Sequence, residues 1–189
     1  MGRATGAGVN VLVLTDRTLT GGRPLVDVVR AAVDGGATRV VLREKDLSRR
    51  ERAALADQVR AFVPELLVAS DPSIGAGGVH LAASDPFPSE RPAIVGRSCH
   101  SRDDLARAVA EGCDYATLSP IFVSASKPGY GPPLGVDVLR DAPLPVYALG
   151  GIDASNARSC IDAGAHGVAV MGYVMRADDP AVAVKELLR

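Results

Sequence analysis

The sequence predicts an α/β fold, a compact (β/α)8 TIM barrel built as one domain over residues 1–189. Eight short apolar runs of strand length recur along the chain, and helical patterns lie between several of them. The runs are continuous rather than alternating, which is typical of parallel strands covered on both faces. A doubly wound open sheet is the alternative, but no G-x-G-x-x-G motif follows the first run.

The eight predicted strands share runs of Val, Leu and Ala that finish in polar residues or glycine. They cover residues 9–16, 39–45, 65–71, 78–85, 93–98, 115–122, 145–151 and 166–172. In a parallel barrel, function lies at the carboxyl ends of the strands. The polar residues that close each run are therefore the candidates for a site.

Five segments have the apolar spacing of helices: 24–36, 48–63, 101–113, 153–167 and 178–189. Pro24 stands early in the first segment, and Gly35 and Gly36 are its predicted stop. Ser48 with Glu51 three residues later is a capping-box pattern. These start and stop signals support the alternation of strands and helices.

The other helix boundaries are less uniform. Ser101 is the predicted start of the third helix, and Asp153 or Ser155 opens the fourth. Residues 71–77 are too few for a helix, and residues 84–92 are rich in proline. We therefore expect the helices after strands three and four to be shortened or missing.

Composition and charge exclude several classes of protein. The net charge of −1 gives no sign of a nucleic-acid partner or a membrane surface. The apolar runs are far shorter than the ~20 residues of a membrane span, and the first residues lack a signal-peptide pattern, so a cytoplasmic protein is expected. Cys99, Cys113 and Cys160 are widely spaced, which predicts reduced, largely buried cysteines rather than disulfides or a zinc site.

Cationic residues follow the second strand in the sequence Arg43-Glu44-Lys45. Because side chains alternate along a strand, Arg43 and Lys45 should point the same way and Glu44 the other way. Two cations on one side of a barrel rim suit a phosphate or a pyrophosphate. The alternative is an ordinary solvated strand end in which Glu44 forms a salt bridge.

The loop after strand six contains one cation among small residues. Ser124, Ser126 and Lys127 lie in a segment rich in glycine and proline. Such a loop is typical of a flap that grips a phosphate through its backbone and its lysine. A surface loop without a ligand is the alternative.

Carboxylates close strands three and four. Asp71 follows Ser70, and Asp85 follows Ser84. Two carboxylates at the ends of adjacent strands can hold Mg²⁺, which also binds phosphates. Each Asp also precedes a proline, so a turn or a cap is the alternative interpretation.

Glycines close the last two strands. Gly151 and Gly172 each precede a helical segment, and loops at these places form the usual phosphate pocket of such barrels. The sequence thus suggests one anion site made of cations and Mg²⁺ and another made of backbone amides. Two phosphorylated ligands at one barrel mouth imply group transfer with a pyrophosphate leaving group.

The order of these motifs resembles the thiamine phosphate synthase family, together with its thiazole tautomerase relatives in the TenI superfamily. The matching pieces are "LREK", "SD" at the family's Asn-Asp, "GVHLAASD", "GRSCHS", "DYATLSPIFVSASK", "YALGGI" and "GVAVM". They occur in family order and cover about residues 10 to 175.

The resemblance implies an Mg²⁺-dependent reaction of two small phosphorylated substrates. A hydroxymethylpyrimidine pyrophosphate loses pyrophosphate, and the nitrogen of a thiazole phosphate captures the pyrimidine methyl cation. By position, the pyrophosphate-binding residues would be Arg43, Lys45, Ser98 and Lys127; the Mg²⁺ ligands Asp71 and Asp85; the loop hydroxyls Ser124 and Ser126; and the thiazole-phosphate pocket Gly151, Met171 and Gly172. Family likeness alone makes a homodimer plausible.

Departures from the family pattern keep other functions open. Val41 replaces a Gln that contacts the pyrimidine, Ser70 replaces an Asn, and Ala82-Ala83 replaces Gly-Gln. One alternative is a TenI-type thiazole tautomerase, although its catalytic His falls at Pro120. The other is a barrel that binds a thiamine precursor without turnover. His80 is expected to have a structural role.

Overall fold

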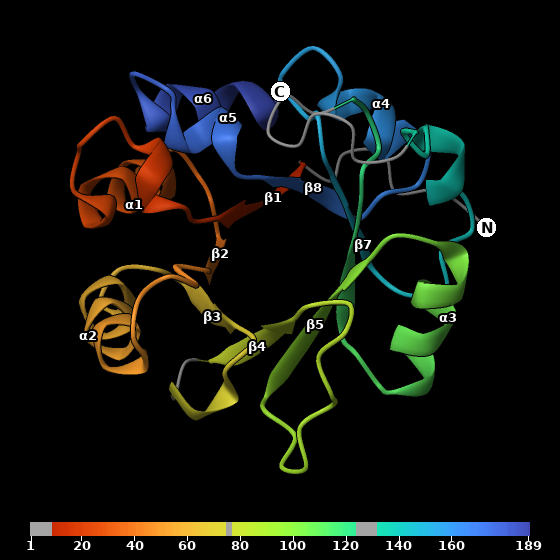
Figure 1. Ribbon diagram of the computed structural model, residues 1–189. Helices are drawn as coiled ribbons and strands as arrows, with labels where there is room; N and C mark the ends of the chain where they lie inside the picture. Colours follow the sequence, from red (N-terminus) through yellow and green to blue (C-terminus); the bar gives the residue numbers. More distant parts are fainter. Residues whose placement is uncertain (1–8, 75–76, 124–131) are drawn as a thin grey trace.

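The computed structural model describes residues 9–74, 77–123 and 132–189, and it has the predicted closed barrel of eight parallel strands (Figure 1). Each strand pairs with the next one in sequence, and β8 closes the ring by pairing with β1. The strands are β1 Asn10–Leu14, β2 Arg39–Leu42, β3 Glu65–Ala69, β4 Gly78–Leu81, β5 Ile94–Cys99, β6 Tyr115–Leu118, β7 Val146–Leu149 and β8 Gly167–Val170. The open-sheet alternative is thereby excluded.

Two apolar layers follow from the alternation of side chains along the strands. On β2, Val40 and Leu42 belong to the layer between the strands and the helices, whereas Val41 belongs to the barrel interior. The interior layer also contains Leu12 and Leu67, and all five of these side chains are fully buried. The barrel is therefore filled rather than hollow, and residues at odd positions of β2 face its axis.

A polar cluster closes the amino-terminal end of the barrel. Arg39 forms an ion pair with Glu65 and donates to the hydroxyl of Tyr147 at 3.2 Å. Its guanidinium also lies over the ring of Tyr115, 4.7 Å from the centroid. These contacts lie at the amino-terminal end of the barrel, opposite the carboxyl ends of the strands.

Six helices surround the strands, and most of the predicted caps are confirmed. They are α1 Leu25–Asp34, α2 Arg49–Arg60, α3 Arg102–Ala110, α4 Ala157–Asp162, α5 Gly172–Met175 and α6 Pro180–Leu187 among the described residues. Ser48 and Glu51 form the predicted capping box. The Ser101 side chain accepts from the Asp104 N–H at 3.1 Å and caps α3. Gly36 has a φ of 112°, which explains the stop after α1.

The predicted start of the fourth helix was wrong. The α4 helix begins at Ala157, not at Asp153 or Ser155. The Asp153 carboxylate accepts instead from the N–H and hydroxyl of Ser155, at 2.8 and 2.6 Å, which holds a turn. The one-turn helix α5, directly after β8, was not separated from the following helix in the sequence.

The two weak connections are confirmed. Between β3 and β4 the described residues contain only a single 3-10 turn, Pro72–Ile74, and residues 82–93 between β4 and β5 contain no helix. Figure 1 shows the helical layer interrupted beside β4, where this last connection runs as a loop. The outer faces of β4 and β5 carry a small apolar cluster of Val79, Leu81 and Val95.

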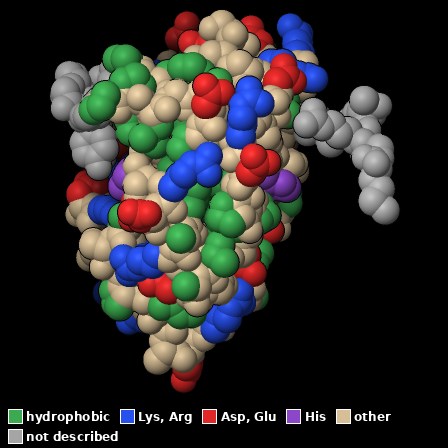
Figure 2. All heavy atoms as spheres, turned by 90° about the vertical axis from the view of Figure 1, so that its right-hand side faces the viewer, with side chains coloured by type: hydrophobic (Ala, Val, Ile, Leu, Met, Phe, Trp, Pro, Cys, Tyr) green, Lys and Arg blue, Asp and Glu red, His purple; other side chains and the backbone are tan. Residues whose placement is uncertain are grey.

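The outer surface agrees with the near-neutral composition. On the flank that carries α3 and α4, Figure 2 shows basic and acidic side chains intermixed rather than gathered by sign. Within the described ranges, the helices are all too short or too polar to span a membrane. All three cysteines are free, Cys99 and Cys160 are buried, and Cys113 is half-buried.

Candidate functional site at the carboxyl ends of the strands

Polar residues from β2, β3, β4 and β5 converge at the carboxyl end of the barrel. His80 and Ser98 are hydrogen-bonded across β4 and β5 at 3.0 Å. Arg43, Lys45 and Asp85 lie close enough to His80 to influence its charge. We call this group of residues, together with Ser70, the β2–β5 mouth. Chain positions up to 55 residues apart (43 to 98) thus meet at one place.

The three charged residues after β2 divide as the alternation predicts. Glu44 is 3% exposed and accepts from the Thr15 hydroxyl at 2.7 Å and from the Arg17 N–H at 3.1 Å. Arg43 turns the other way, toward β8, where its Nη1 lies 3.1 Å from the Met171 sulfur. Glu44 therefore ties the end of β2 to the loop after β1, and this anchor holds Arg43 over the mouth.

Ser70 and Asp85 form the carboxylate side of the mouth. Ser70 has a φ of 62°, a left-handed conformation that Asn adopts more readily than Ser. Burial alone raises the pKa of Asp85, but its neighbours Ser70, the Ala82 N–H, Lys45 and Arg97 outweigh burial and lower the pKa. The carboxylate is therefore ionised at neutral pH.

Asp71 lies one residue from Ser70 and makes the contacts of a turn. Its carboxylate accepts from the Ser73 N–H at 3.1 Å and from the Ser73 hydroxyl, and it lies 3.8 Å from Arg49. Asp85 likewise accepts from the Ala82 N–H at 2.7 Å. Both aspartates thus have the capping contacts that the sequence left as the alternative. These contacts do not use all the oxygen lone pairs of a carboxylate.

A buried hydrogen-bond chain supports the mouth from below. The Tyr115 hydroxyl lies 2.9 Å from His80 Nδ1, and His80 Nε2 lies 3.0 Å from the Ser98 hydroxyl. Burial, reinforced by Arg43 and Lys45, lowers the pKa of His80 to about 3, so the ring is neutral. The Tyr115 hydroxyl donates to Nδ1, so the hydrogen of the neutral ring lies on Nε2 and is donated to the Ser98 hydroxyl. The sequence had assigned His80 a structural role and had not linked it to Ser98.

The neutral state of His80 predicts a pH dependence of stability. An unfolded histidine has a pKa of about 6.5, so from there down to pH 3 the unfolded chain binds more protons. The free energy of unfolding should therefore fall on acidification, by at most ~1.4 kcal/mol per pH unit for this group. In His80→Gln, urea titrations between pH 6.5 and 5 should show a flatter slope. His166→Gln is the comparison: burial also lowers the pKa of this half-buried ring, so its slope should flatten less than that of the fully buried His80. An unchanged slope in His80→Gln would contradict the assignment.

Glycines shape the opposite side of the mouth. Gly151 has a φ of 67°, and a Cβ there would lie 2.5 Å from the Val123 carbonyl oxygen. Gly172 begins α5 directly after Met171, whose sulfur contacts Arg43. The candidate phosphate pocket after β7 and β8 is therefore next to the β2–β5 mouth. The predicted loop residues Ser124, Ser126 and Lys127 lie outside the described residues.

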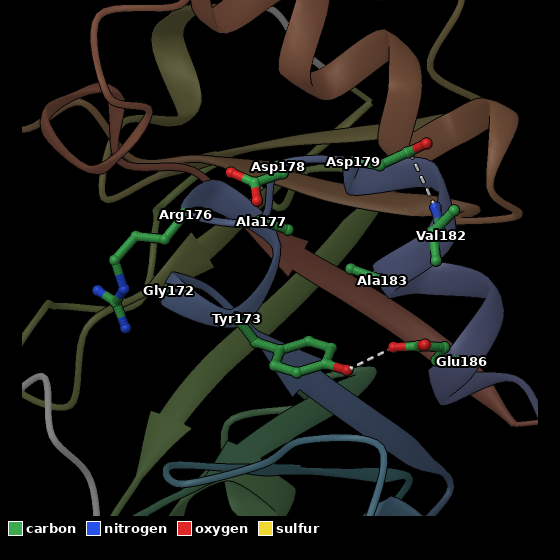
Figure 3. A pocket seen from close by; sticks show the side chains of 9 residues that line it. All are labelled: Gly172, Tyr173, Arg176, Ala177, Asp178, Asp179, Val182, Ala183 and Glu186. Carbon is green, nitrogen blue, oxygen red and sulfur yellow. Dashed lines mark hydrogen bonds between the residues drawn. The ribbon is translucent and has the colours of Figure 1, made fainter.

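A cavity of about 450 Å³ lies outside the barrel, between α5 and α6 (Figure 3). Tyr173 and Glu186 are hydrogen-bonded across it at 3.0 Å, and Asp178 and Asp179 line its rim. It shares only Gly172 with the predicted site residues. The cavity is thus separate from the β2–β5 mouth.

The carboxylates fit a magnesium ion that a ligand helps to bind. Among the residues that the structure describes, no three His, Cys, Asp or Glu side chains form a metal-binding group. Mg²⁺ is commonly held by one or two carboxylates, by water and by the phosphates of a substrate. Asp71 and the ionised Asp85, which follow the adjacent strands β3 and β4, are carboxylates of that kind, and Arg43 and Lys45 would face the phosphates.

Comparisons with known proteins agree with the geometry. The profile of a family described as "Thiamine monophosphate synthase" matches residues 11–174. The thiamine-phosphate synthase of Roseiflexus castenholzii is 36% identical over 204 residues, covering 97% of this chain and 88% of the relative. That of Albidiferax ferrireducens is 38% identical over 197 residues, covering 95% and 90%.

Solved structures give the same result. Thiamine phosphate pyrophosphorylase from Pyrococcus furiosus superposes with a TM-score of 0.82 at 29% identity, covering 95% of this chain and 93% of that chain. A 3-hexulose-6-phosphate synthase has a TM-score of 0.69 at 16% identity, which shows a shared fold only. The barrel fold alone is compatible with many functions, and the sequence match is what assigns this chain to one family.

Proposed function

Because this chain belongs to the thiamine monophosphate synthase family, we propose that it is a thiamine-phosphate synthase. It joins hydroxymethylpyrimidine pyrophosphate to thiazole phosphate and releases pyrophosphate. The observation that carries this function is the convergence of Arg43, Lys45, Asp85 and Ser98 on one end of the barrel. A cytoplasmic location is part of this proposal, and the resemblance in the sequence implies that the partners are these two small molecules.

The β2–β5 mouth would bind the pyrimidine pyrophosphate. Arg43 and Lys45 pair with the diphosphate oxygens, and the Ser98 hydroxyl donates to one of them because His80 Nε2–H occupies its lone pair. The bond between the methylene carbon and the bridging oxygen breaks, and the electron pair leaves with pyrophosphate. The fixed cations stabilise this charge more in the transition state than in the substrate.

Asp71 and Asp85 would hold Mg²⁺ beside these cations. The ion, when bound, neutralises part of the negative charge that grows on the leaving group. The Ala82 N–H holds the Asp85 carboxylate, so this group does not have to reorganise during the reaction. The Ser70 side chain is shorter than the Asn of the family pattern, yet it still helps to lower the pKa of Asp85.

The glycine side of the mouth would bind the thiazole phosphate. Gly151 allows the phosphate to approach the backbone closely, and Met171 and Gly172 place the first amides of α5 beside this position. The thiazole nitrogen then donates its lone pair to the methylene carbon to form the new C–N bond. Ser124 and Ser126 are proposed as hydroxyl donors from the loop after β6.

One incubation tests this function. The protein is mixed with both thiamine precursors and Mg²⁺, and thiamine phosphate is detected by mass spectrometry. Product formation that stops when Mg²⁺ is chelated is the expected result. A proton exchange on the thiazole without Mg²⁺ would support a tautomerase instead. Tight binding of thiazole phosphate without turnover in either assay would support a non-catalytic binder.

Lys127 provides the first variant for this assay. Lys127→Ala should lower kcat/KM by about 10²-fold or more, because the sequence resemblance assigns this cation to the pyrophosphate leaving group. The fold should remain intact, as judged by circular dichroism and thermal unfolding. Lys185→Ala, which removes an exposed lysine of α6, is the matched control and should retain full activity. An unchanged rate in Lys127→Ala would count against the synthase.

A further inference from the structure

Arg97 is a buried cation in an unusual place. It belongs to β5, is 1% exposed and is paired in register with Leu81 of β4. Its neighbours Val95 and Cys99, two positions away on either side, face the apolar outer layer. An arginine here must be desolvated, which is costly unless its donors are satisfied. Its partners therefore indicate what it does.

The partners of Arg97 are the carbonyls of the loop that replaces a helix after β4. Arg97 Nη1 lies within hydrogen-bond distance of the carbonyl oxygens of Ala82, Ala83 and Asp85, at 2.9, 3.3 and 3.0 Å. Its Nη2 forms an ion pair with Glu111, at the end of α3, at 2.6 Å, but neither Nη2 nor Nε meets hydrogen-bond geometry with a partner, so Nη1 provides the hydrogen bonds. In a helix these carbonyls would have backbone partners, so one guanidinium takes over that task.

The same turn fixes Asp85. Its N–H donates to the Ala82 carbonyl at 3.1 Å, and its carboxylate accepts from the Ala82 N–H at 2.7 Å. Ala82 O is thus shared between Arg97 and the Asp85 N–H. Without the guanidinium the turn would lose its outer support, and the carboxylate at the mouth would lose its fixed orientation.

We propose that Arg97 is a positioning residue: by binding three carbonyls of the loop 82–85 it holds the Asp85 carboxylate in place for the metal and the diphosphate. This role rests on the proposed function for the metal, but the ordering of the loop does not. The sequence resemblance does not mark Arg97, since it occupies the variable position of the "GRSCHS" motif.

A closely matched control is available on α3. Arg107 donates to the Ala83 carbonyl at 3.0 Å and forms an ion pair with Glu111 at 2.8 Å, so it shares two partners with Arg97. Its side chain is 46% exposed, whereas that of Arg97 is 1% exposed. Exposed pairs of this kind contribute little, so Arg107→Met should behave as the unaltered protein.

The first measurement needs no substrate. Amide hydrogen exchange over residues 82–87 should be at least about tenfold faster in Arg97→Met, with Arg107→Met within about twofold of the unaltered protein. The second measurement is the Mg²⁺ concentration for half-maximal turnover. It should rise by about 10- to 100-fold in Arg97→Met, as expected for a residue that supports a metal ligand, while the KM for thiazole phosphate stays unchanged.

A double variant separates positioning from general loosening. If Arg97 acts through Asp85, adding Arg97→Met to Asp85→Asn should not raise the Mg²⁺ requirement further. Normal exchange in Arg97→Met, or equal losses for Mg²⁺ and thiazole phosphate, would overturn the role. Should Arg97→Met fail to fold, Arg97→Lys gives the decision, because it keeps a cation on a shorter side chain and lacks the second nitrogen that pairs with Glu111. Intermediate exchange supports the role, and normal exchange overturns it. If the unaltered protein makes no thiamine phosphate, the proposed function fails while the exchange comparison still decides the loop.

Discussion

Replacing Arg43 by alanine should lower kcat/KM by about 10²- to 10³-fold while leaving the fold intact. Arg43 is held over the mouth by contacts to Thr15 O at 3.4 Å and to the Met171 sulfur at 3.1 Å, so its charge is preorganised. Since pyrophosphate gains charge as it leaves, the loss should fall mainly on kcat rather than on KM. Steady-state kinetics with each substrate varied in turn measures this division.

Two further variants sharpen the result for Arg43. Arg43→Lys should recover only part of the rate, because an ammonium cannot bind two phosphate oxygens in the planar geometry of a guanidinium. Arg60→Ala, on α2, removes an exposed arginine paired only with Asp57 at 3.4 Å among the described contacts and should be fully active. Equal activity in Arg43→Ala and Arg60→Ala would remove the reason to place a diphosphate at this mouth.

The largest expected effect on stability comes from Gly96→Ala. A Cβ at this position of β5 would overlap ring atoms of Tyr115 and lie 2.5 Å from its hydroxyl oxygen. Overpacking of a filled interior costs about 3 kcal/mol when neither side can move. The ring would also be pushed away from His80, so Ser98 should lose its oriented partner and activity should fall as well. Urea unfolding with parallel kinetics measures both losses.

Gly21→Ala is the control for Gly96→Ala. Gly21 has a φ of 64°, but no atom lies within 4 Å of a Cβ built there. Its replacement should therefore lower the free energy of unfolding only by the cost of a left-handed alanine, about 1 kcal/mol. Combining Gly96→Ala with Tyr115→Leu should recover part of the stability by making room for the methyl group. A loss in Gly96→Ala no greater than that in Gly21→Ala would show that the barrel interior yields easily.

Much of the fold could be predicted because its signals are local. Continuous apolar runs and the capping box at Ser48 depend on residues close in sequence, and both are confirmed. The start of α4 was missed because Asp153 and Ser155 are equally good in a cap or in a turn. That choice depends on the Asn156 side chain, which donates to the Gly151 carbonyl at 2.8 Å.

The candidate site could be predicted from the sequence only where the order of the strands decides which residues meet at the carboxyl end of the barrel. Arg43, Ser70 and Ser98 lie at the ends of neighbouring strands, so a closed barrel brings them together, whereas Asp85 lies four residues after β4 and depends on the turn from Ala82. The buried support could not be predicted, because His80 reads as an ordinary core residue until Tyr115 and Ser98 are known to flank it. The support of Asp85 by the buried Arg97 could not be predicted either, because Arg97 binds the carbonyls of a loop that stands in place of a helix.

The filled interior of the barrel has a kinetic consequence. Since buried side chains occupy the barrel down to Arg39, Glu65 and Tyr147 at its amino-terminal end, both reactants enter and both products depart at the carboxyl ends of the strands. If one reactant lies deeper in the mouth than the other, it can leave only after its neighbour has left. Product-inhibition patterns with added pyrophosphate would therefore report the order of binding and release, in which the last molecule to bind is the first to dissociate.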